Sequence, residues 1–169
     1  TMQEVKDLIL DKNQIFQKVK RIAFEIYENN ISEKELIIAG IPTEGYKLAK
    51  MLVKELSNIT PFKLTLARII LDKKGKMNSK VELDIDPGLA SGKTVIIVDD
   101  VLHTGKTFIL GMKPFLEVDV KKIQVAVLIN RSYAIFPVNS NYTGYELSTT
   151  LNEHIKVNLD RKGFGVYLY

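Results

Sequence analysis

Two adjacent carboxylates, Asp99 and Asp100, stand in a stretch whose residue types could bind a phosphorylated sugar. This stretch, Val95–Thr107, reads VIIVDDVLHTGKT. Adjacent carboxylates would repel a phosphate, but they suit sugar hydroxyls or Mg²⁺. The hydroxyl and glycine residues of the loop 104–107 suit a phosphate, because they supply donors and allow a close backbone approach. The local chemistry therefore indicates a ligand with a phosphate at one end and a diol nearby, such as a ribose 5-phosphate.

A strand and a helix must position these groups. The run Val95–Val98 is apolar and mostly β-branched, which is typical of a strand buried on both faces. The loop after it leads into an apolar pattern at helical spacing, formed by Phe108, Leu110, Met112, Phe115 and Leu116. Ligands bind at the carboxyl ends of parallel strands, and a helix N-terminus attracts anions. The alternative is an ordinary capped turn, although a cap needs one side-chain oxygen and this stretch offers four polar side chains.

A second strand, loop and helix precede the first. The run Leu36–Ala39 predicts a buried strand, and the loop 40–45 holds two glycines that can turn N–H groups toward an anion. The following helix would bury Leu48, Ala49, Leu52, Val53 and Leu56. A plain strand–helix turn is the alternative, but the nearby acidic motif favours an anion-binding loop.

The remaining elements are predicted more coarsely. Asp11 and Gln14 indicate a capping box at the start of a helix that ends at Asn29-Asn30. Strands are expected at 62–71, 121–129, 155–159 and 166–169, and a turn at 142–146. The polar stretch after Asp72 is either a functional loop or a solvated hairpin, and its candidate anion-binding lysines are Lys73, Lys74, Lys76 and Lys80.

Length and composition predict a single domain spanning residues 1–169, with 46% hydrophobic and 26% charged residues. The chain has no cysteine, which excludes disulfides and thiolate metal sites. No apolar run approaches the ~20 residues that a membrane span needs, and no signal peptide is evident, so we expect a cytoplasmic protein without membrane contact. The net charge of +4 is too small to indicate nucleic-acid binding by itself.

The stretch Val95–Thr107 closely resembles the 5-phosphoribosyl-1-pyrophosphate (PRPP) motif of the type I phosphoribosyltransferases. Four segments in this order and spacing resemble the bacterial pyrimidine operon regulators of the PyrR type: LDKNQI…KRIAFEI, AGIPTEGYKLA, VIIVDDVLHTGKT and QVAVLINR. Members of that family are similar to uracil phosphoribosyltransferases in activity and also bind pyrimidine-operon mRNA as oligomers. The resemblance implies an α/β fold with a central, mainly parallel sheet flanked by helices. It also implies a small C-terminal hood, formed by about residues 130–169 and the N-terminal segment.

The resemblance implies transfer of ribose 5-phosphate from PRPP to a nucleobase, with uracil as the first choice and release of pyrophosphate. The implied catalytic residues are Asp99, Asp100 and His103, and the two aspartates would also hold Mg²⁺ through water. The implied 5-phosphate loop is Val101, Leu102, His103, Thr104, Gly105, Lys106 and Thr107. The implied pyrophosphate loop is Ile41, Pro42, Thr43, Glu44 and Gly45, and the implied base site is Asn130, Arg131, Tyr145 and Glu146.

The sequence departs from this family at four places. The loop after Leu71 is lysine-rich, whereas the family has an acidic pattern that contains arginine. Glu44 stands where the family usually has an arginine, so an acid would weaken pyrophosphate binding if it faced the ligand and change nothing if it pointed away. Tyr133-Ala134 replaces a His-Arg pair implicated in RNA contact, so we expect RNA binding to be weak or absent. The stretch 144–150 keeps little of the family's hood sequence beyond glycine and threonine.

His103 is one of two histidines in the chain and lies inside the predicted phosphate loop, four residues after Asp99. An imidazole titrates near ~6.5 and could exchange a proton with a nucleobase. A polar residue in a surface turn is the alternative.

Two functions remain open at this stage. One is a phosphoribosyltransferase; the other is a weakly catalytic or non-catalytic sensor of PRPP or a nucleoside monophosphate that acts on RNA or a protein partner. In either case the resemblance implies a homo-oligomer, a dimer or a tetramer.

Overall fold

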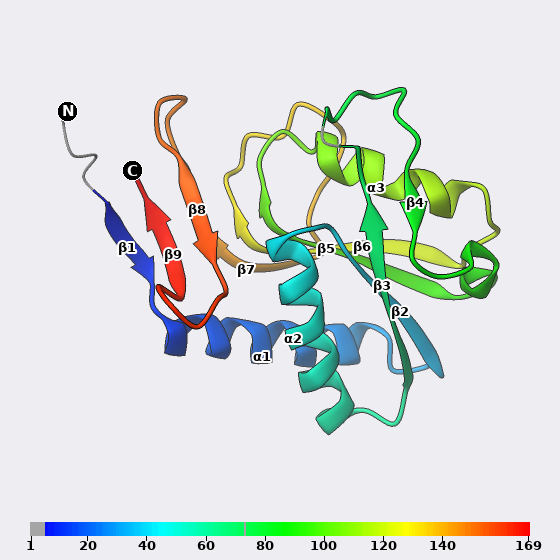
Figure 1. Ribbon diagram of the computed structural model, residues 1–169. Helices are drawn as coiled ribbons and strands as arrows, with labels where there is room; N and C mark the ends of the chain where they lie inside the picture. Colours follow the sequence, from blue (N-terminus) through cyan, green and yellow to red (C-terminus); the bar gives the residue numbers. More distant parts are fainter. Residues whose placement is uncertain (1–5, 73) are drawn as a thin grey trace.

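The core of the protein is a six-stranded sheet with helices on both faces (Figure 1). The computed structural model describes residues 6–72 and 74–169. In spatial order the strands are β4 (Glu82–Leu83), β3 (Lys63–Ile70), β2 (Glu35–Gly40), β5 (Thr94–Leu102), β6 (Lys122–Asn130) and β7 (Tyr142–Glu146). All neighbours pair in parallel except the short β4, which is antiparallel to β3. The carboxyl ends of the five parallel strands therefore meet at one edge.

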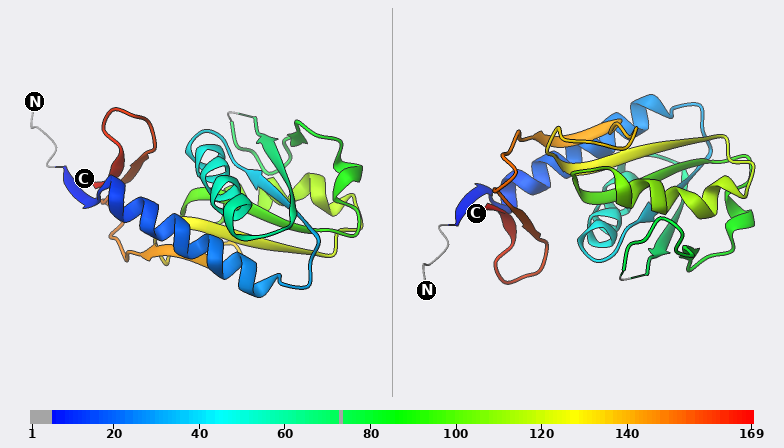
Figure 2. Two further views of the ribbon diagram at one scale, coloured as in Figure 1. Left: turned by 90° about the horizontal axis from the view of Figure 1, so that it is seen from below. Right: turned by 90° about the horizontal axis from the view of Figure 1, so that it is seen from above.

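Helices cover the sheet on both sides. Helices α1 (Lys12–Asn29) and α2 (Glu44–Ile59) pack on one face, and α3 (Lys106–Leu116) packs on the other with the 3₁₀ turn η1 (Pro87–Ala90) (Figures 1 and 2). Residues of β5 alternate between the two cores, with Ile96 and Val98 facing α1 and α2 and with Val95 and Ile97 facing α3. Because both faces are buried, the strand reads as a continuous apolar run, as predicted.

Helix α1 begins at the predicted capping box. The side chain of Asp11 accepts from the backbone N–H of Gln14 at 2.8 Å, and the Gln14 side chain accepts from the Asp11 N–H at 2.9 Å. These bonds satisfy N–H groups that the helix itself leaves unpaired. The predicted helix and its start are confirmed.

A second sheet joins the two ends of the chain. It has the order β1 (Asp7–Leu10), β9 (Gly165–Leu168) and β8 (Ile155–Asn158), and all of its pairs are antiparallel. Phe164, in the turn between β8 and β9, stacks on Phe16 of α1 with ring centroids 5.6 Å apart. This small sheet therefore sits at the start of α1, beside the central sheet (Figures 1 and 2).

One sequence-based expectation was wrong. We expected only a turn at residues 142–146, but this segment is β7, the edge strand of the central sheet. Its pattern misled the prediction because Gly144 interrupts it and only Tyr142 and Gly144 are buried. Within residues 6–72 and 74–169, no helix is long and apolar enough to cross a membrane.

The packing around Gly40, at the end of β2, leaves no room for a larger side chain. A Cβ at this position would lie 2.6 Å from the Tyr46 Cα and 2.9 Å from the Ala49 Cβ. We expect Gly40→Ala to lower the free energy of unfolding by about 1–3 kcal/mol, since the backbone of α2 would have to move. Urea denaturation measures this change. Gly88→Ala is the control, because its nearest neighbour is a side-chain oxygen of Asp86 at 3.3 Å, and equal losses in both variants would contradict the prediction.

Candidate active site

Asp99 and Asp100 lie near the carboxyl end of β5, at the edge where the parallel strands end. Asp99 is 8% exposed, and its Oδ1 accepts from the Asp100 N–H at 2.8 Å. The Oδ1 of Asp100 accepts from the Val101 N–H at 2.9 Å. One oxygen of each carboxylate thus bonds to the local backbone, which fixes both side chains at the sheet edge.

Burial makes this acidic pair electrostatically unfavourable. Burial raises the pKa of Asp99 well above its ordinary value, and the neighbouring Asp100 charge raises it further. The pKa of Asp100 is also raised, mainly by burial and in part by the negative charge of Glu44. Groups with strongly shifted pKa values gather at functional sites, and a bound cation would favour the ionised forms of both aspartates.

The loop after β5 forms a small concave site at the start of α3. Gly105 precedes the helix with φ of 90°, a left-handed conformation that favours glycine. A cavity of about 160 Å³ is lined by Val101, His103, Thr104, Gly105, Thr107 and Phe108. The first N–H groups of a helix have no intrahelical partners, and the helix dipole is positive there. The predicted phosphate-loop residues are thus gathered around a helix N-terminus, the geometry that binds anions.

A segment from the second half of the chain covers this loop. The N–H groups of Ile135 and Phe136 donate to the carbonyl oxygen of Thr104 at 2.9 and 3.0 Å. A Cβ on Gly105 would lie 3.3 Å from the Cβ of Val138. The segment 135–138 therefore holds the outer side of the loop, a role that its sequence did not indicate.

The second glycine loop meets the acidic pair directly. A Cβ on Gly45 would lie 2.7 Å from the Asp99 Oδ1 and 2.9 Å from the Val98 carbonyl oxygen. This close approach requires glycine and places the first turn of α2 against the end of β5. The peptide bond between Pro42 and Thr43 is cis, and the Thr43 side chain makes no capping bond to α2. The two predicted anion loops thus share one edge of the sheet, with Asp99 between them.

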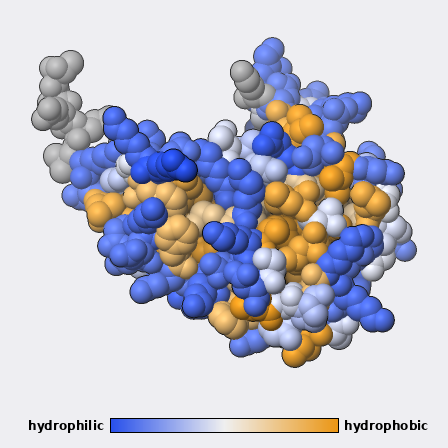
Figure 3. Space-filling model, turned by 60° about the horizontal axis from the view of Figure 1, so that its bottom comes forward, coloured by the Kyte–Doolittle hydropathy of each residue, from blue (hydrophilic) through white to orange (hydrophobic). Residues whose placement is uncertain are grey.

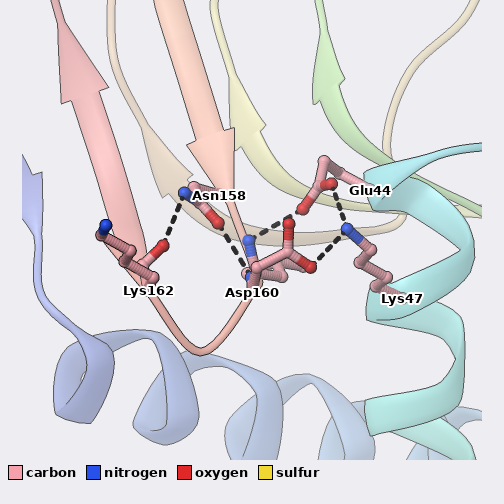
Figure 4. Close-up of polar contacts among 6 residues, drawn as sticks. Glu44, Lys47, Asn158, Asp160 and Lys162 are labelled. Atoms are coloured by element: carbon pink, nitrogen blue, oxygen red, sulfur yellow. Dashed lines mark hydrogen bonds and ion pairs between the residues drawn. The ribbon is translucent and has the colours of Figure 1, made fainter.

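The side chain of Glu44 is held by groups outside the loop (Figure 4). Its Oε1 accepts from Lys47 Nζ at 2.7 Å, and its Oε2 accepts from the N–H of Leu159, just after β8, at 2.8 Å. Lys47 Nζ also donates to Asp160 Oδ1 at 2.7 Å. The acid that replaces the family's arginine therefore ties the start of α2 to the turn between β8 and β9, although its charge is still felt at Asp100.

His103 lies exposed at the mouth of the phosphate loop. Its ring is 5.6 Å from the Tyr133 ring, centroid to centroid, with 31° between the planes. Burial lowers the pKa of His103, and the positive charge of Arg131 lowers it further. The imidazole is therefore mostly neutral at pH 7 and able to accept a proton.

The predicted base-site residues lie at the end of β6, directly after it, and on β7. Asn130 and Glu146 are register partners at the ends of β6 and β7, and the Asn130 amide donates to the Glu146 carboxylate at 3.4 Å. Tyr145 lies near α1, where Lys18 Nζ is 5.7 Å from its ring centroid. Arg131 is buried and donates to Thr149 Oγ1 at 2.7 Å and to the Glu153 carbonyl oxygen at 2.8 Å. These bonds hold the segment 149–153 in place, and they occupy the Nε and Nη2 donors of Arg131.

The lysine-rich stretch after Asp72 is bonded to β4 and α3. Lys80 forms an ion pair with Glu82 at 2.9 Å, and the backbone of Met77 and Ser79 accepts from Lys113 of α3. Lys74 and Lys76 lie in the same stretch, whereas Lys73 lies outside the described residues. None of these contacts selects one lysine for a ligand.

A larger cavity lies away from both loops. It has a volume of about 500 Å³ between α1, α2 and the β8–β9 turn, with an apolar floor of Phe16, Val19, Met51, Leu159 and Phe164. Lysines of α2 and Arg161 form its rim. Figure 3 shows the face that carries α1 and α2, where apolar side chains are interrupted by hydrophilic ones. The candidate active site is nevertheless the smaller cavity, because it lies at the start of α3, where the helix N–H groups are free, and next to the end of β5, which carries Asp99 and Asp100.

Sequence reasoning missed Lys47 and Asp160, which complete the tie from Glu44 to the β8–β9 turn. They are 113 positions apart, and neither stands in a pattern that indicates a contact.

Comparison with known proteins identifies the family. A family model described as a phosphoribosyl transferase domain matches residues 6–161. The chain belongs to the phosphoribosyltransferase family. The bifunctional protein PyrR of Bacillus pumilus is 35% identical over 166 residues, covering 93% of this chain and 92% of that protein. The bifunctional protein PyrR of Bacillus subtilis is 34% identical over 164 residues, covering 92% of this chain and 91% of that protein. The predicted resemblance is confirmed.

Solved phosphoribosyltransferases confirm the predicted α/β fold. A hypoxanthine-guanine phosphoribosyltransferase from Bacillus anthracis superimposes with a TM-score of 0.78 at 18% identity, covering 98% of each chain. A hypoxanthine phosphoribosyltransferase from Staphylococcus aureus gives a TM-score of 0.73 at 16% identity, covering 88% of this chain and 85% of that one. At these identities the likeness concerns the fold alone.

The acidic pair of this phosphoribosyltransferase fits a magnesium ion only in part. Residues 6–72 and 74–169 contain no cluster of three or more acidic or histidine side chains placed to hold a metal. Mg²⁺ commonly binds one or two carboxylates and completes its shell with water and substrate phosphates. Asp99 and Asp100 would suit this mode, since each keeps one oxygen free of the hydrogen bonds described above and a nearby cation would offset the effect of burial and of the negative charges that raise both pKa values.

The raised pKa of Asp99 predicts a pH-dependent cost in stability. Because this pKa is higher in the folded than in the unfolded chain, ionisation of Asp99 lowers stability as the pH rises above about 4. We expect Asp99→Asn to raise the free energy of unfolding at pH 8, and the gain to vanish near pH 4. Urea denaturation across this range measures both effects. Asp119→Asn, at an exposed position, is the matched control, and a loss of stability at pH 8 in Asp99→Asn would contradict the prediction.

Proposed function

We propose that the protein is a PRPP-dependent phosphoribosyltransferase that transfers ribose 5-phosphate to a nucleobase and releases pyrophosphate. The observation that carries this proposal is the contact of Gly45 with Asp99, which brings two anion loops to either side of a buried acidic pair. PRPP carries a phosphate at one end, a pyrophosphate at the other and a diol between them. The ligand therefore presents its phosphate, diol and pyrophosphate in the same order in which the site presents the loop 101–107, the acidic pair and the loop 41–45.

Each part of the site has a role in this proposal. The loop 101–107 binds the 5-phosphate through the first N–H groups of α3 and through the hydroxyls of Thr104 and Thr107. Asp99 and Asp100 accept hydrogen bonds from the ribose hydroxyls, directly or through water. The loop 41–45 binds the pyrophosphate through the backbone N–H groups of its last three residues, since Pro42 has none and the Ile41 N–H donates to the Val98 carbonyl. The Glu44 carboxylate is held by Lys47 and the Leu159 N–H, so it does not occupy the anion's place.

The reaction separates charge, and the site is arranged to stabilise both ends. As the bond from ribose to pyrophosphate breaks, positive charge develops on the ring and negative charge on the leaving group. The carboxylates of Asp99 and Asp100 stabilise the ring, and the N–H groups of the loop 41–45 stabilise the leaving group. When bound, Mg²⁺ supplies further positive charge to the pyrophosphate.

Uracil is the first choice of nucleobase, because relatives at 32–35% identity are named PyrR or pyrimidine operon regulatory protein. The same names support a second candidate, a sensor of PRPP or a nucleoside monophosphate with little catalysis. Both candidates agree with a cytoplasmic homo-oligomer, a dimer or a tetramer. RNA binding stays a prediction of weak or absent affinity, because Tyr133-Ala134 stands in place of the basic pair.

A direct assay separates the two candidates. We expect the wild-type protein to consume PRPP with uracil, Mg²⁺ and no other protein, and more slowly or not at all with other nucleobases. Asp99→Asn combined with Asp100→Asn should abolish turnover and Mg²⁺-dependent PRPP binding, since the ribose and metal contacts are lost. Calorimetry and release of pyrophosphate measure these effects.

Glu117→Gln combined with Asp119→Asn removes the same charge at exposed positions beyond the end of α3 and serves as the control. Wild-type binding of PRPP without turnover on any nucleobase would favour the sensor. Unchanged PRPP affinity in the Asp99 and Asp100 double variant would overturn the site assignment.

The pKa of His103 predicts a pH dependence for transfer. If the neutral imidazole takes a proton from the nucleobase, the rate should rise with pH through a pKa below the ordinary histidine value, because burial and Arg131 lower it. His103→Gln should lose this limb of the pH–rate profile while keeping PRPP affinity. Steady-state kinetics from pH 5 to 9 give the profile. Superimposable profiles for the two proteins would make His103 a bystander.

A further inference from the structure

The pyrophosphate loop has no cation of its own. Residues 41–45 include one charged side chain, the acid Glu44, and the nearest lysine along α2, Lys47, is already bonded to Glu44 and Asp160. A pyrophosphate carries several negative charges in a small volume. Backbone N–H groups alone would leave much of that charge without a counter-charge, so a cation from another element is needed.

Arg68 lies beside this loop, on the neighbouring strand. It is near the carboxyl end of β3 and is the register partner of Gly40, the last residue of β2 before the loop. Gly40 is packed against Tyr46 of the first turn of α2, where a Cβ would lie 2.6 Å from the Tyr46 Cα. These two contacts place Arg68, Gly40 and Tyr46 side by side at the edge where the ligand is proposed to bind.

The guanidinium of Arg68 rests on the Tyr46 ring, with its Cζ 4.1 Å from the ring centroid. This is the distance of a cation–π contact, which holds the flat guanidinium in place. The backbone of Arg68 is anchored as well, since its N–H donates to Asp84 Oδ1 at 2.7 Å and its carbonyl accepts from the Asp84 N–H at 3.1 Å. The side chain is thus ordered by a neutral ring and not by a carboxylate.

The charge of Arg68 is available to a ligand. Arg68 is exposed, and the ion pairs found among residues 6–72 and 74–169 do not include it. A guanidinium presents two parallel N–H donors that match the oxygens of a phosphate. The Arg68 guanidinium is therefore ordered and able to donate hydrogen bonds to a phosphate, next to a loop that has no cationic side chain.

We propose that Arg68 is the pyrophosphate-binding cation of this site, supplied by β3 in place of the arginine that the loop lacks at Glu44. This inference rests on the proposed function, since it assigns the counter-charge of the same ligand. Tyr46 positions the guanidinium, and Glu44 is turned to the β8–β9 turn. Arg68 on β3 thus supplies the positive charge of the pyrophosphate site. The negative charge of Glu44 points away from it, toward the β8–β9 turn.

The test compares Arg68→Gln with Lys50→Gln. Lys50 Nζ lies 5.2 Å from the same Tyr46 ring centroid, but one helical turn farther from the loop, so this control removes an equal charge from the same aromatic ring. Calorimetry with Mg²⁺ measures the affinity of each protein for PRPP and for uridine 5′-monophosphate, which shares the 5-phosphate and ribose but has no pyrophosphate.

We expect Arg68→Gln to weaken PRPP binding about tenfold or more, as for loss of a hydrogen bond to a charged group. Its affinity for the monophosphate should stay unchanged, and Lys50→Gln should match the wild type for both ligands. Arg68→Lys, which keeps the charge without the flat fork, should lie between the wild type and Arg68→Gln. In turnover, the KM for PRPP should rise in Arg68→Gln while the KM for the nucleobase stays constant.

Several results would overturn the inference. Equal PRPP affinity in Arg68→Gln and wild type would show that Arg68 does not contact the ligand. Parallel losses for PRPP and the monophosphate, or an equal loss in Lys50→Gln, would assign Arg68 a structural role on Tyr46. Failure of the wild-type protein to bind PRPP at all would instead overturn the proposed function itself, and this outcome is distinct from the others.

Discussion

The site depends on the close approach of the first turn of α2 to the ends of two strands. Gly40 lets the Tyr46 backbone lie against β2, and Gly45 lets the helix reach Asp99 and the Val98 carbonyl on β5. A side chain at either glycine would push α2 outward. The two anion loops would then separate, and the buried acid between them would open to water. Backbone contact, rather than any side-chain bond, therefore sets the distance between the two proposed anion-binding loops.

The electrostatic interactions among the acidic side chains of the site lower the stability of the folded protein. Asp99 and Asp100 are buried beside each other, and Glu44 adds a third negative charge nearby. In the free protein this charge opposes folding, whereas a ligand that brings a cation and hydroxyl donors relieves it. Binding of the proposed ligand would thus offset part of the stability that the acidic pair costs, which is a common trade between function and stability.

Much of this structure was predictable, because local signals decide it. The apolar run before Asp99, the capping box at Asp11 and the order of strand, acid and glycine loop each have a short-range cause. The strand at 142–146 was missed because its burial comes from β6 and α1 rather than from its own pattern. The direction of Glu44 was equally hidden, since its partner Leu159 lies 115 positions away and its other partner, Lys47, is shared with the similarly distant Asp160.

The small sheet has a consequence for the folding of the chain. Its central strand, β9, is the last strand of the chain, and its partner β1 is the first. Asp7 of β1 pairs with Leu168 of β9, so a very long stretch of chain must be closed before this sheet can form. Because pairing between distant segments is slow, we expect the strand–helix units of the central sheet to form before the small sheet. The Glu44 carboxylate, which accepts from the Leu159 N–H just after β8, would then reach its final orientation late in folding.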